Sequence, residues 1–327
     1  MIARAMLGLA LIAGALASPV AAAPAPPAAS AALRPALDAL QALDTRVQSV
    51  GWKLAAGNAR WCARPVPAIG LQLFDAASFG DPGAVRAALA LPGDIAVEAV
   101  ADGSPAGSAG LSPHLPVSAI AGKPTEPAGA PPLRSAYARL VALHDAIDAA
   151  LVATNSVTLA VGSGAATRTV TITGQPVCAS RFEMLTEDNH AAADGTRVVV
   201  SRKLVEFLPA DDELAALLAH ELAHNILGHR ARLDASGRSW GNILATEREA
   251  DRLSVWLLAA AGYDPEAALR FMARWGPAND NGIFSTPDHD RWKTRIERMT
   301  REIAALRTAV AADPAHEVNW PRDFARG

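Results

Sequence analysis

The segment His220-Glu221-Leu222-Ala223-His224 is the part of this chain whose residue types and spacing could do chemistry. Residues four apart lie on the same face of a helix, so the imidazoles of His220 and His224 can meet at one point. Two neutral imidazoles at that spacing supply two of the three protein ligands of a catalytic zinc site. Glu221 lies beside them, where a carboxylate can accept a proton from a water that the metal activates. The alternative is a buried helix with hydrogen-bonded core histidines, but burying these polar groups without a metal is costly.

The third protein ligand of such a site must come from elsewhere in the chain. One known pattern places a Gly three residues and a His six residues after the second His. Here those positions hold Leu227 and Arg230, and Gly228 and His229 are each displaced by one residue. We therefore expect His229 to be an ordinary helix residue and not a ligand.

A carboxylate on the following helix is the other source of a third ligand. Residues 246–263 are predicted to form a helix with Glu247 and Asp251 on one face and Glu249 on a different face. One of the first two could bind the metal while the other orients a ligand histidine. The alternative is a solvated helix start, which a run of alternating acidic and basic residues also suits.

The helix that must position the two histidines is predicted from about Asp211 to Leu227. Asp211, Asp212 and Glu213 follow Pro209 and place negative charge in the first turn, where it favours the helix dipole. An Ala/Leu-rich run then carries the motif through a mostly apolar segment.

Two longer stretches, HELAHNILGH and EREADRLSVWLLAAAGYDP, together resemble the M48 family of zinc metallopeptidases, which pairs HExxH with a downstream ExxxD. The stretch 189–201 is similar to the strand that precedes the metal helix in this family. The resemblance covers roughly residues 180–300 and implies a helix-rich gluzincin metallopeptidase domain with a small edge sheet over 178–312. It implies that His220, His224 and Glu247 bind one Zn²⁺, that Glu221 is the general base, and that Asp251 orients a ligand.

One further pair of residues is assigned through the same resemblance. The family has a Ser-Thr-His-Pro-like stretch before its last helix, with an Arg six residues after the His. In this chain the Pro is displaced, but His289 and Arg295 keep that spacing. The resemblance implies that one or both donate to the developing oxyanion, and the alternative is a helix-capping His289 and a surface Arg295.

The first residues have the pattern of a targeting signal. Arg4 is followed by an apolar run from Met6 to Ala17 and then by small residues, which predicts a signal peptide over 1–22 cleaved between Ala22 and Ala23. The run is too short to span a bilayer comfortably, and no later segment reads as a membrane helix. We expect a periplasmic or secreted protein, the alternative being a membrane anchor formed by an uncleaved signal.

Charge and cysteine content add two expectations. The formal net charge is −3 and no basic run occurs, so nucleic acid is not an expected partner. The only cysteines are Cys62 and Cys178. In an oxidising compartment we expect them to form a disulfide, and two separate buried thiols are the alternative.

The region between the leader and the second cysteine has a different character. We expect an Ala/Pro-rich tether over 23–30 and an amphipathic helix over 31–55 that packs on its own protein, together filling 23–62. Over 63–177, a strand at 95–100 is followed by Ser-Pro-Ala and Ala-Gly-Leu and then by a strand at 117–123, a pattern that resembles a PDZ domain. The resemblance implies a helix over 133–151, strands at 157–161 and 167–172, and a carboxylate-binding loop at 68–71. The alternative is a PDZ-like brace that binds no peptide.

These interpretations combine into an α+β protein with a PDZ-like β-rich domain before a metallopeptidase domain. A final helix over about 290–311 and a tail over 313–327, docked by Trp320 or Phe324, complete it. We expect an exported zinc endopeptidase that acts on polypeptides, with envelope proteins as substrates. The substrate is expected along the edge of the strand at 198–201, and the PDZ-like domain is expected to select C-termini. The alternative is a non-catalytic PDZ-type peptide-binding or chaperone-like protein.

Overall fold

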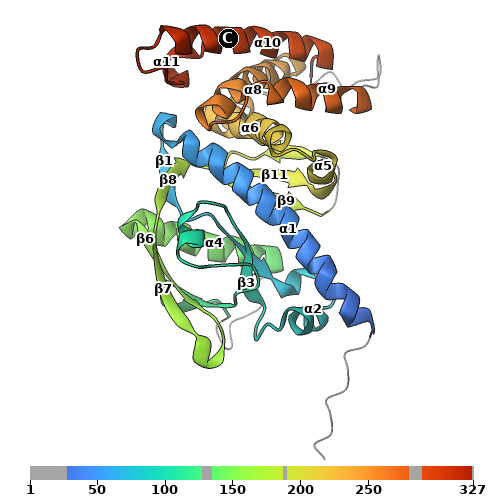
Figure 1. The fold of residues 1–327 in the computed structure, drawn as a ribbon, viewed down its shortest axis with the longest axis vertical. Coiled ribbons are helices and arrows are strands. Elements are labelled where there is room, and N and C mark those ends of the chain that lie inside the picture. The colour runs from blue at the N-terminus through green and yellow to red at the C-terminus, as the bar shows by residue number, and fades with distance from the viewer. Residues whose placement is uncertain (1–27, 127–134, 187–189, 280–288, 326–327) are drawn as a thin grey trace, which may run out of the picture.

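The computed structural model describes residues 28–126, 135–186, 190–279 and 289–325. The predicted signal peptide at 1–22 and the stretch 285–288 ahead of His289 lie outside these residues. Figure 1 shows two parts stacked along the long axis, a strand-rich part formed by the N-terminal half and a helical part formed by the C-terminal half. The predicted mixture of helices and strands is therefore found.

Helix α1, Ala28–Gly57, lies along both parts and contributes to both cores (Figure 1). Leu37 packs with α2, Pro82–Leu89, in one apolar cluster. Val47, Val50 and Leu54 pack in the large cluster of the helical part. The predicted amphipathic helix is confirmed, including its packing on its own protein, although it begins at Ala28 and so includes the end of the expected tether.

In the strand-rich part, helix α4, Ala136–Thr154, packs against strands of this part through one face that includes the buried Ile147 and Leu151. The largest sheet of this part has the antiparallel order β5-β4-β6-β7, formed by Lys123–Pro124, Val117–Ile120, Ser156–Val161 and Arg168–Thr173. A separate antiparallel pair joins β2, Leu71–Asp75, to β3, Ile95–Val100, and the short α3, Pro105–Ser108, follows β3. The strands predicted at 95–100, 157–161 and 167–172 are thus confirmed, as is the helix predicted over 133–151 for the residues that the structure describes. The strand predicted at 117–123 ends at Ile120, because the chain turns at 121–122 and returns as the separate strand β5.

The two ends of the strand-rich part are held together. Strand β1, Pro65–Ala68, pairs antiparallel with β8, Gln175–Cys178, with Pro65 opposite Cys178. Cys62 and Cys178 form a disulfide with their Cα atoms 5.5 Å apart, which confirms the predicted pairing.

The helical part begins with a three-stranded sheet of order β10-β11-β9, formed by Ala191–Ala193, Arg197–Ser201 and Arg181–Leu185. The stretch expected to be one strand is a hairpin, because the chain turns at Asp194 and Gly195 between β10 and β11. Strand β11 is paired on both sides and has no free edge. The expectation that a substrate lies along the edge of 198–201 is therefore wrong, and the outer strand on this side is β10.

Helices complete this part: α5 Arg202–Phe207, α6 Asp211–Leu227, α7 His229–Ser236, α8 Trp240–Ala260, α9 Ala267–Asn279, α10 Trp292–Ala312 and α11 Trp320–Asp323. The apolar helix α6 packs against α8, α9 and α1, and most of its residues are buried. Helix α8 begins at Trp240, earlier than predicted, because Ser239 caps it by accepting a hydrogen bond from the Asn242 N–H.

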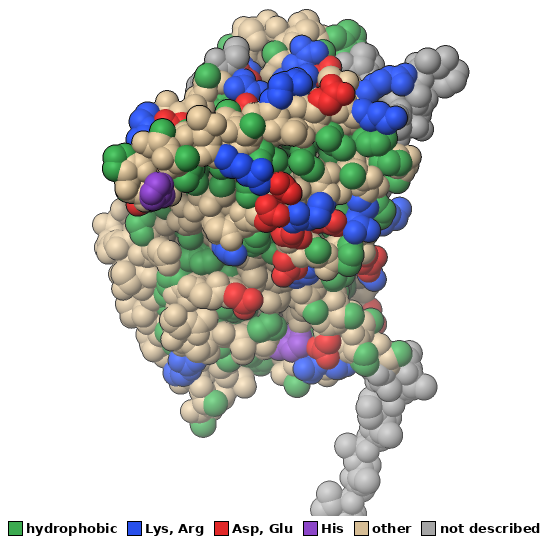
Figure 2. All heavy atoms as spheres, turned by 45° about the horizontal axis from the view of Figure 1, so that its top comes forward, with side chains coloured by type: hydrophobic (Ala, Val, Ile, Leu, Met, Phe, Trp, Pro, Cys, Tyr) green, Lys and Arg blue, Asp and Glu red, His purple; other side chains and the backbone are tan. Residues whose placement is uncertain are grey.

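The tail docks as predicted through Trp320 and Phe324, both buried, and the Trp320 indole N–H donates to Asn58 Oδ1 at 3.1 Å. Acidic and basic side chains lie interspersed on the face shown in Figure 2. Among the described helices, none combines the length and apolar character needed to cross a membrane.

Candidate metal centre

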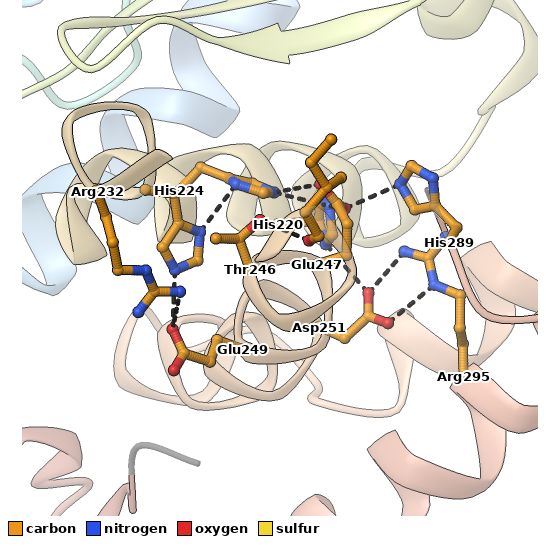
Figure 3. Close-up of polar contacts among 11 residues, drawn as sticks. His220, His224, Arg232, Thr246, Glu247, Glu249, Asp251, His289 and Arg295 are labelled. Carbon is orange, nitrogen blue, oxygen red and sulfur yellow. Dashed lines mark hydrogen bonds and ion pairs between the residues drawn. The ribbon is translucent and has the colours of Figure 1, made fainter. Parts of the chain in front are cut away.

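Three side chains from two helices converge on one point. His220 and His224 come from α6, and Glu247 comes from α8, which packs directly on α6. Glu247 Oε2 lies 3.2 Å from His220 Nε2, Glu247 Oε1 lies 3.5 Å from His224 Nε2, and the two Nε2 atoms are 3.3 Å apart (Figure 3). The structure therefore brings together the three residues expected to bind metal.

The donor atoms have the spacing that zinc requires. Zinc bonds of about 2.0–2.1 Å at tetrahedral angles place ligand atoms about 3.3 Å apart. The three observed separations are 3.2, 3.3 and 3.5 Å. Burial opposes the ionisation of Glu247, but hydrogen bonds with His220, His224 and His289 hold the pKa of this carboxyl well below its usual range. Two imidazoles and one carboxylate therefore form a donor set that fits zinc.

Asp251 and Arg295 lie behind the first ligand. His220 Nδ1 is 3.1 Å from Asp251 Oδ1. The Arg295 guanidinium holds Asp251 through two contacts, Nε to Oδ2 at 2.8 Å and Nη2 to Oδ1 at 2.6 Å. Burial raises the pKa of Asp251, but the charge of Arg295 and the contact with His220 outweigh it and lower that pKa. Asp251 thus lies where it can orient His220, and the buried Arg295 is engaged with Asp251, not exposed on the surface.

Glu221 lies in a cavity of about 320 Å³ that the metal ligands also line. The wall opposite the helices is formed by the three alanines of β10, Ala191–Ala193. The Glu221 carboxylate, the candidate metal-binding triad and the outer edge of β10 therefore share one cavity, and the small β10 side chains leave room beside them.

His289 lies at the same cavity, with its Nε2 atom 2.8 Å from Glu247 Oε2. Burial lowers the pKa of His289, but the contact with Glu247 outweighs it and raises that pKa above the usual value. The structure thus places His289 beside the metal ligands, whereas Arg295 does not line the cavity.

His229, expected to be an ordinary helix residue, instead contacts a metal ligand. Its Nδ1 lies 2.9 Å from His224 Nδ1, and its Nε2 lies 3.1 Å from Glu249 Oε2. Glu249 in turn pairs with Arg232 at 2.8 Å (Figure 3). Burial, together with the nearby His224, lowers the pKa of His229 to about 4, so that its ring is neutral. Gly228 is a sequence signal for a break in the helix directly before His229, but it does not give the angle at which the chain restarts.

Asn225 is a second residue beside the candidate site that the sequence reasoning missed. From α6, its side-chain amide donates to Arg197 O at 3.0 Å and to Ser180 Oγ at 2.8 Å, and its Oδ1 accepts from the Gly195 N–H at 2.7 Å. These bonds hold the β10–β11 turn and the start of β9 against the metal helix. Asn225 therefore fixes the distance between the outer strand and the metal centre.

Comparisons with known proteins agree with this geometry. Residues 182–244 match the profile described as Peptidase family M48, a segment that includes His220, Glu221 and His224. The chain is also 25% identical over 158 residues to the mitochondrial metalloendopeptidase OMA1 of Schizosaccharomyces pombe. That similarity covers 39% of this chain and 47% of the relative, so the chain spans about half the length of that protein. Together with the convergent His220, His224 and Glu247, these similarities support an M48 metallopeptidase.

Proposed function

We propose that this protein is an exported, zinc-dependent endopeptidase that hydrolyses peptide bonds in protein substrates. The observation that carries the proposal is the presence of a zinc-spaced triad, the carboxylate of Glu221 and a free strand edge in one cavity. The similarity to a peptidase family and to a metalloendopeptidase supports the same reaction class.

His220, His224 and Glu247 would hold the metal, and Asp251 would orient His220. When bound, zinc supplies a Lewis acid that polarises the scissile carbonyl and acidifies a water molecule. Glu221 takes the proton of the attacking water and passes it to the leaving amine as the C–N bond breaks. His289, on the cavity wall, is the candidate donor to the oxyanion that develops on the carbonyl.

The substrate backbone would lie extended along β10. Its amides and carbonyls would pair with the outer edge of Ala191–Ala193, which brings one peptide bond to the metal centre. Hydrogen bonds to the substrate main chain discriminate little between side chains, so selection among substrates requires a second site.

We assign that second site to the strand-rich part, as a PDZ-like domain. Its support is a cavity of about 230 Å³ between β2 and α4, bordered by the loop at 68–71 and also by β9. This groove differs from a fully open one in two respects. The Leu73 N–H already donates to His144 Nε2 at 3.3 Å, and Arg181 of β9 pairs with Asp145 of α4 at 2.8 Å.

The proposal of export rests on the leader at 1–22 and is supported by the Cys62–Cys178 disulfide, since disulfides persist in oxidising compartments. It favours the periplasm or the exterior as the site of action, and envelope proteins as substrates.

Cleavage of an unfolded fluorogenic protein by residues 23–327 tests the proposed reaction. With zinc content verified, Glu221→Gln should lower the rate by about 10²–10⁴-fold, because the proton acceptor is lost. Glu297→Gln makes the same chemical change at an exposed position of α10 and should cleave like the parent. If zinc-loaded parent and Glu221→Gln proteins both leave every tested substrate intact yet bind peptide equally, the non-catalytic binding alternative replaces the proposal.

A further inference from the structure

The two histidine ligands of the metal centre differ in what holds their outer ring nitrogens. At His220, Nδ1 faces the carboxylate of Asp251 at 3.1 Å, the arrangement expected for a metal-binding histidine. At His224, Nδ1 faces another imidazole nitrogen, Nδ1 of His229, at 2.9 Å, and the two rings meet edge to face. A histidine therefore occupies the place that a carboxylate occupies at the other ligand.

Gly228 explains how His229 reaches this position. On an uninterrupted helix, a residue five positions after His224 would lie about 140° around the axis and face away from it. Helix α6 ends instead at Leu227, and its C-cap Gly228 has a φ of 65°, a left-handed conformation that glycine adopts without strain. The chain restarts as α7 at a new angle, and its first residue turns back onto the His224 ring.

The contacts allow one assignment of protons. His224 presents Nε2 to Glu247 and His220, so that nitrogen must keep a free lone pair to bind metal and Nδ1 must carry the hydrogen. His229 Nδ1 is then the acceptor, and its Nε2–H donates to Glu249 Oε2 at 3.1 Å. Arg232 holds the same Glu249 oxygen at 2.8 Å. The sequence of hydrogen bonds runs in one direction from the metal ligand to the carboxylate.

His229 is 1% exposed and Glu249 is 6% exposed. We infer that His229 and Glu249 are positioning residues for the metal ligand His224, fixing its tautomer and ring orientation through this relay; the inference rests on the proposed metal centre. Asp251–Arg295 serves His220 and His229–Glu249–Arg232 serves His224, so each histidine ligand has its own relay ending in an arginine.

A purely structural tie between α7 and α8 is the competing explanation of the same contacts. A tie would affect only the stability of the fold, whereas a positioning relay affects how tightly the folded protein binds metal. Metal affinity of the folded chain separates the two, and it does not depend on peptidase activity.

The experiment measures the zinc affinity of the metal-free full mature chain by competition with a chelating dye. His229→Phe keeps a ring but removes the acceptor, and we expect it to bind zinc about 10–100-fold more weakly, the usual effect of losing such an outer partner. Glu249→Leu should also weaken zinc binding. Glu249→Gln keeps an oxygen that accepts from the His229 N–H, so its zinc affinity should stay close to that of the parent. Leu306→Ala, in the core of α10 and remote from the relay, serves as a destabilised control that should bind zinc like the parent.

A second readout is the visible spectrum of the cobalt-substituted chain, which should change in His229→Phe at saturating cobalt because the ligand ring is no longer fixed. If His229→Phe does not fold, the comparison of Glu249→Leu with Glu249→Gln decides the matter alone. Equal zinc affinity of these two variants would overturn the positioning relay and would favour a purely structural contact between α7 and α8. A parent chain that binds no zinc would overturn the proposed function itself.

Discussion

The residues proposed to bind metal contact a layer of buried polar groups behind them. Asp251 and Arg295 form a two-contact ion pair whose side chains are 3% and 7% exposed. A buried pair of this kind is costly to break, because the remaining charge has neither water nor a partner. The resemblance to known peptidases suggested an oxyanion donor at Arg295, but the observed contacts give it the role of fixing Asp251.

Arg295→Ala should therefore destabilise the fold by about 3–5 kcal/mol, since it leaves the buried Asp251 carboxylate with His220 in place of its two-contact arginine partner. Urea unfolding of the metal-free chain measures this. Arg301→Ala, an exposed arginine on the same helix, should change stability by less than about 0.5 kcal/mol. An Arg295→Ala chain as stable as the parent would show that the fold does not depend on this ion pair.

The residues of the metal site were predictable to the extent that they depend on local geometry. Spacing four apart on a helix is a local property, so His220 with His224 and Glu247 with Asp251 could be grouped from sequence. His229 could not, because its contact depends on a left-handed turn at Gly228 and on the angle at which α7 restarts. Arg295 could be identified as a site candidate, but its contact with Asp251 could not be predicted, since Asp251 lies 44 residues away on another helix.

At the scale of elements, α1 is the piece that couples the two parts of the molecule. It contacts β3 in the strand-rich part and both β9 and α6 in the helical part. Where these elements meet, Asp44 of α1 and Glu98 of β3 are buried together, with Gln41 donating to Glu98 at 3.3 Å and the Met184 backbone bonding to Asp44. Burial, aided by the charge of Glu98, raises the pKa of Asp44 to about 8, and burial raises the pKa of Glu98 as well.

This pair predicts a pH-dependent stability. Because its pKa values are raised on folding, the folded chain holds more protons than the unfolded chain above pH 4, so stability falls as the pH rises towards about 8. Asp44→Asn replaces one carboxyl of the pair by a neutral amide, so the pair no longer has to bind a proton to stay buried. The variant should therefore gain stability relative to the parent between pH 5 and pH 8. Urea midpoints at the two pH values measure this, with the exposed Asp102→Asn as control. If the urea midpoints of the parent and of Asp44→Asn change equally between the two pH values, the Asp44–Glu98 pair does not cause the pH dependence of stability.

Sequence patterns predict where strands occur better than they predict which strands pair. The strands at 95–100 and 157–161 were predictable because short apolar runs between Gly, Pro and Ser are a local signal. The partner order β10-β11-β9 was not, since three short strands can pair in several orders and tertiary packing selects one. The strand to which we assign substrate pairing is consequently β10 and not β11.

At the scale of the whole molecule, α1 runs along both parts, and the disulfide holds the two ends of the strand-rich part together. The Cys62–Cys178 bond spans 116 residues and closes the strand-rich part where it meets the helical part. A bond that closes so long a loop restricts the unfolded chain strongly.

Replacing both cysteines by serine should lower stability by about 2–5 kcal/mol. Thermal or urea unfolding measures the loss, and a reducing agent should destabilise the parent but leave the double variant unchanged. A parent chain indifferent to reductant would show that the disulfide adds no stability.

The groove between β2 and α4 predicts how the two parts cooperate. If it captures C-termini, a substrate with a free terminal carboxylate should be cleaved with a lower KM than its amide, roughly tenfold for an interaction of about 1.5 kcal/mol. Val141→Asp, which places a negative charge in the groove, should remove the difference while the amide is cleaved as before. Equal KM values for both substrates in the parent chain would remove C-terminal selection from the account.

Stoichiometric return of activity with zinc tests the central claim most directly. The metal-free mature chain is titrated with zinc while cleavage of an unfolded protein is followed. The account predicts no cleavage without metal and a rate that rises in proportion to zinc until one ion per chain is bound. Cleavage that is independent of zinc, or a folded chain that takes up zinc at this site and cleaves nothing, would contradict it.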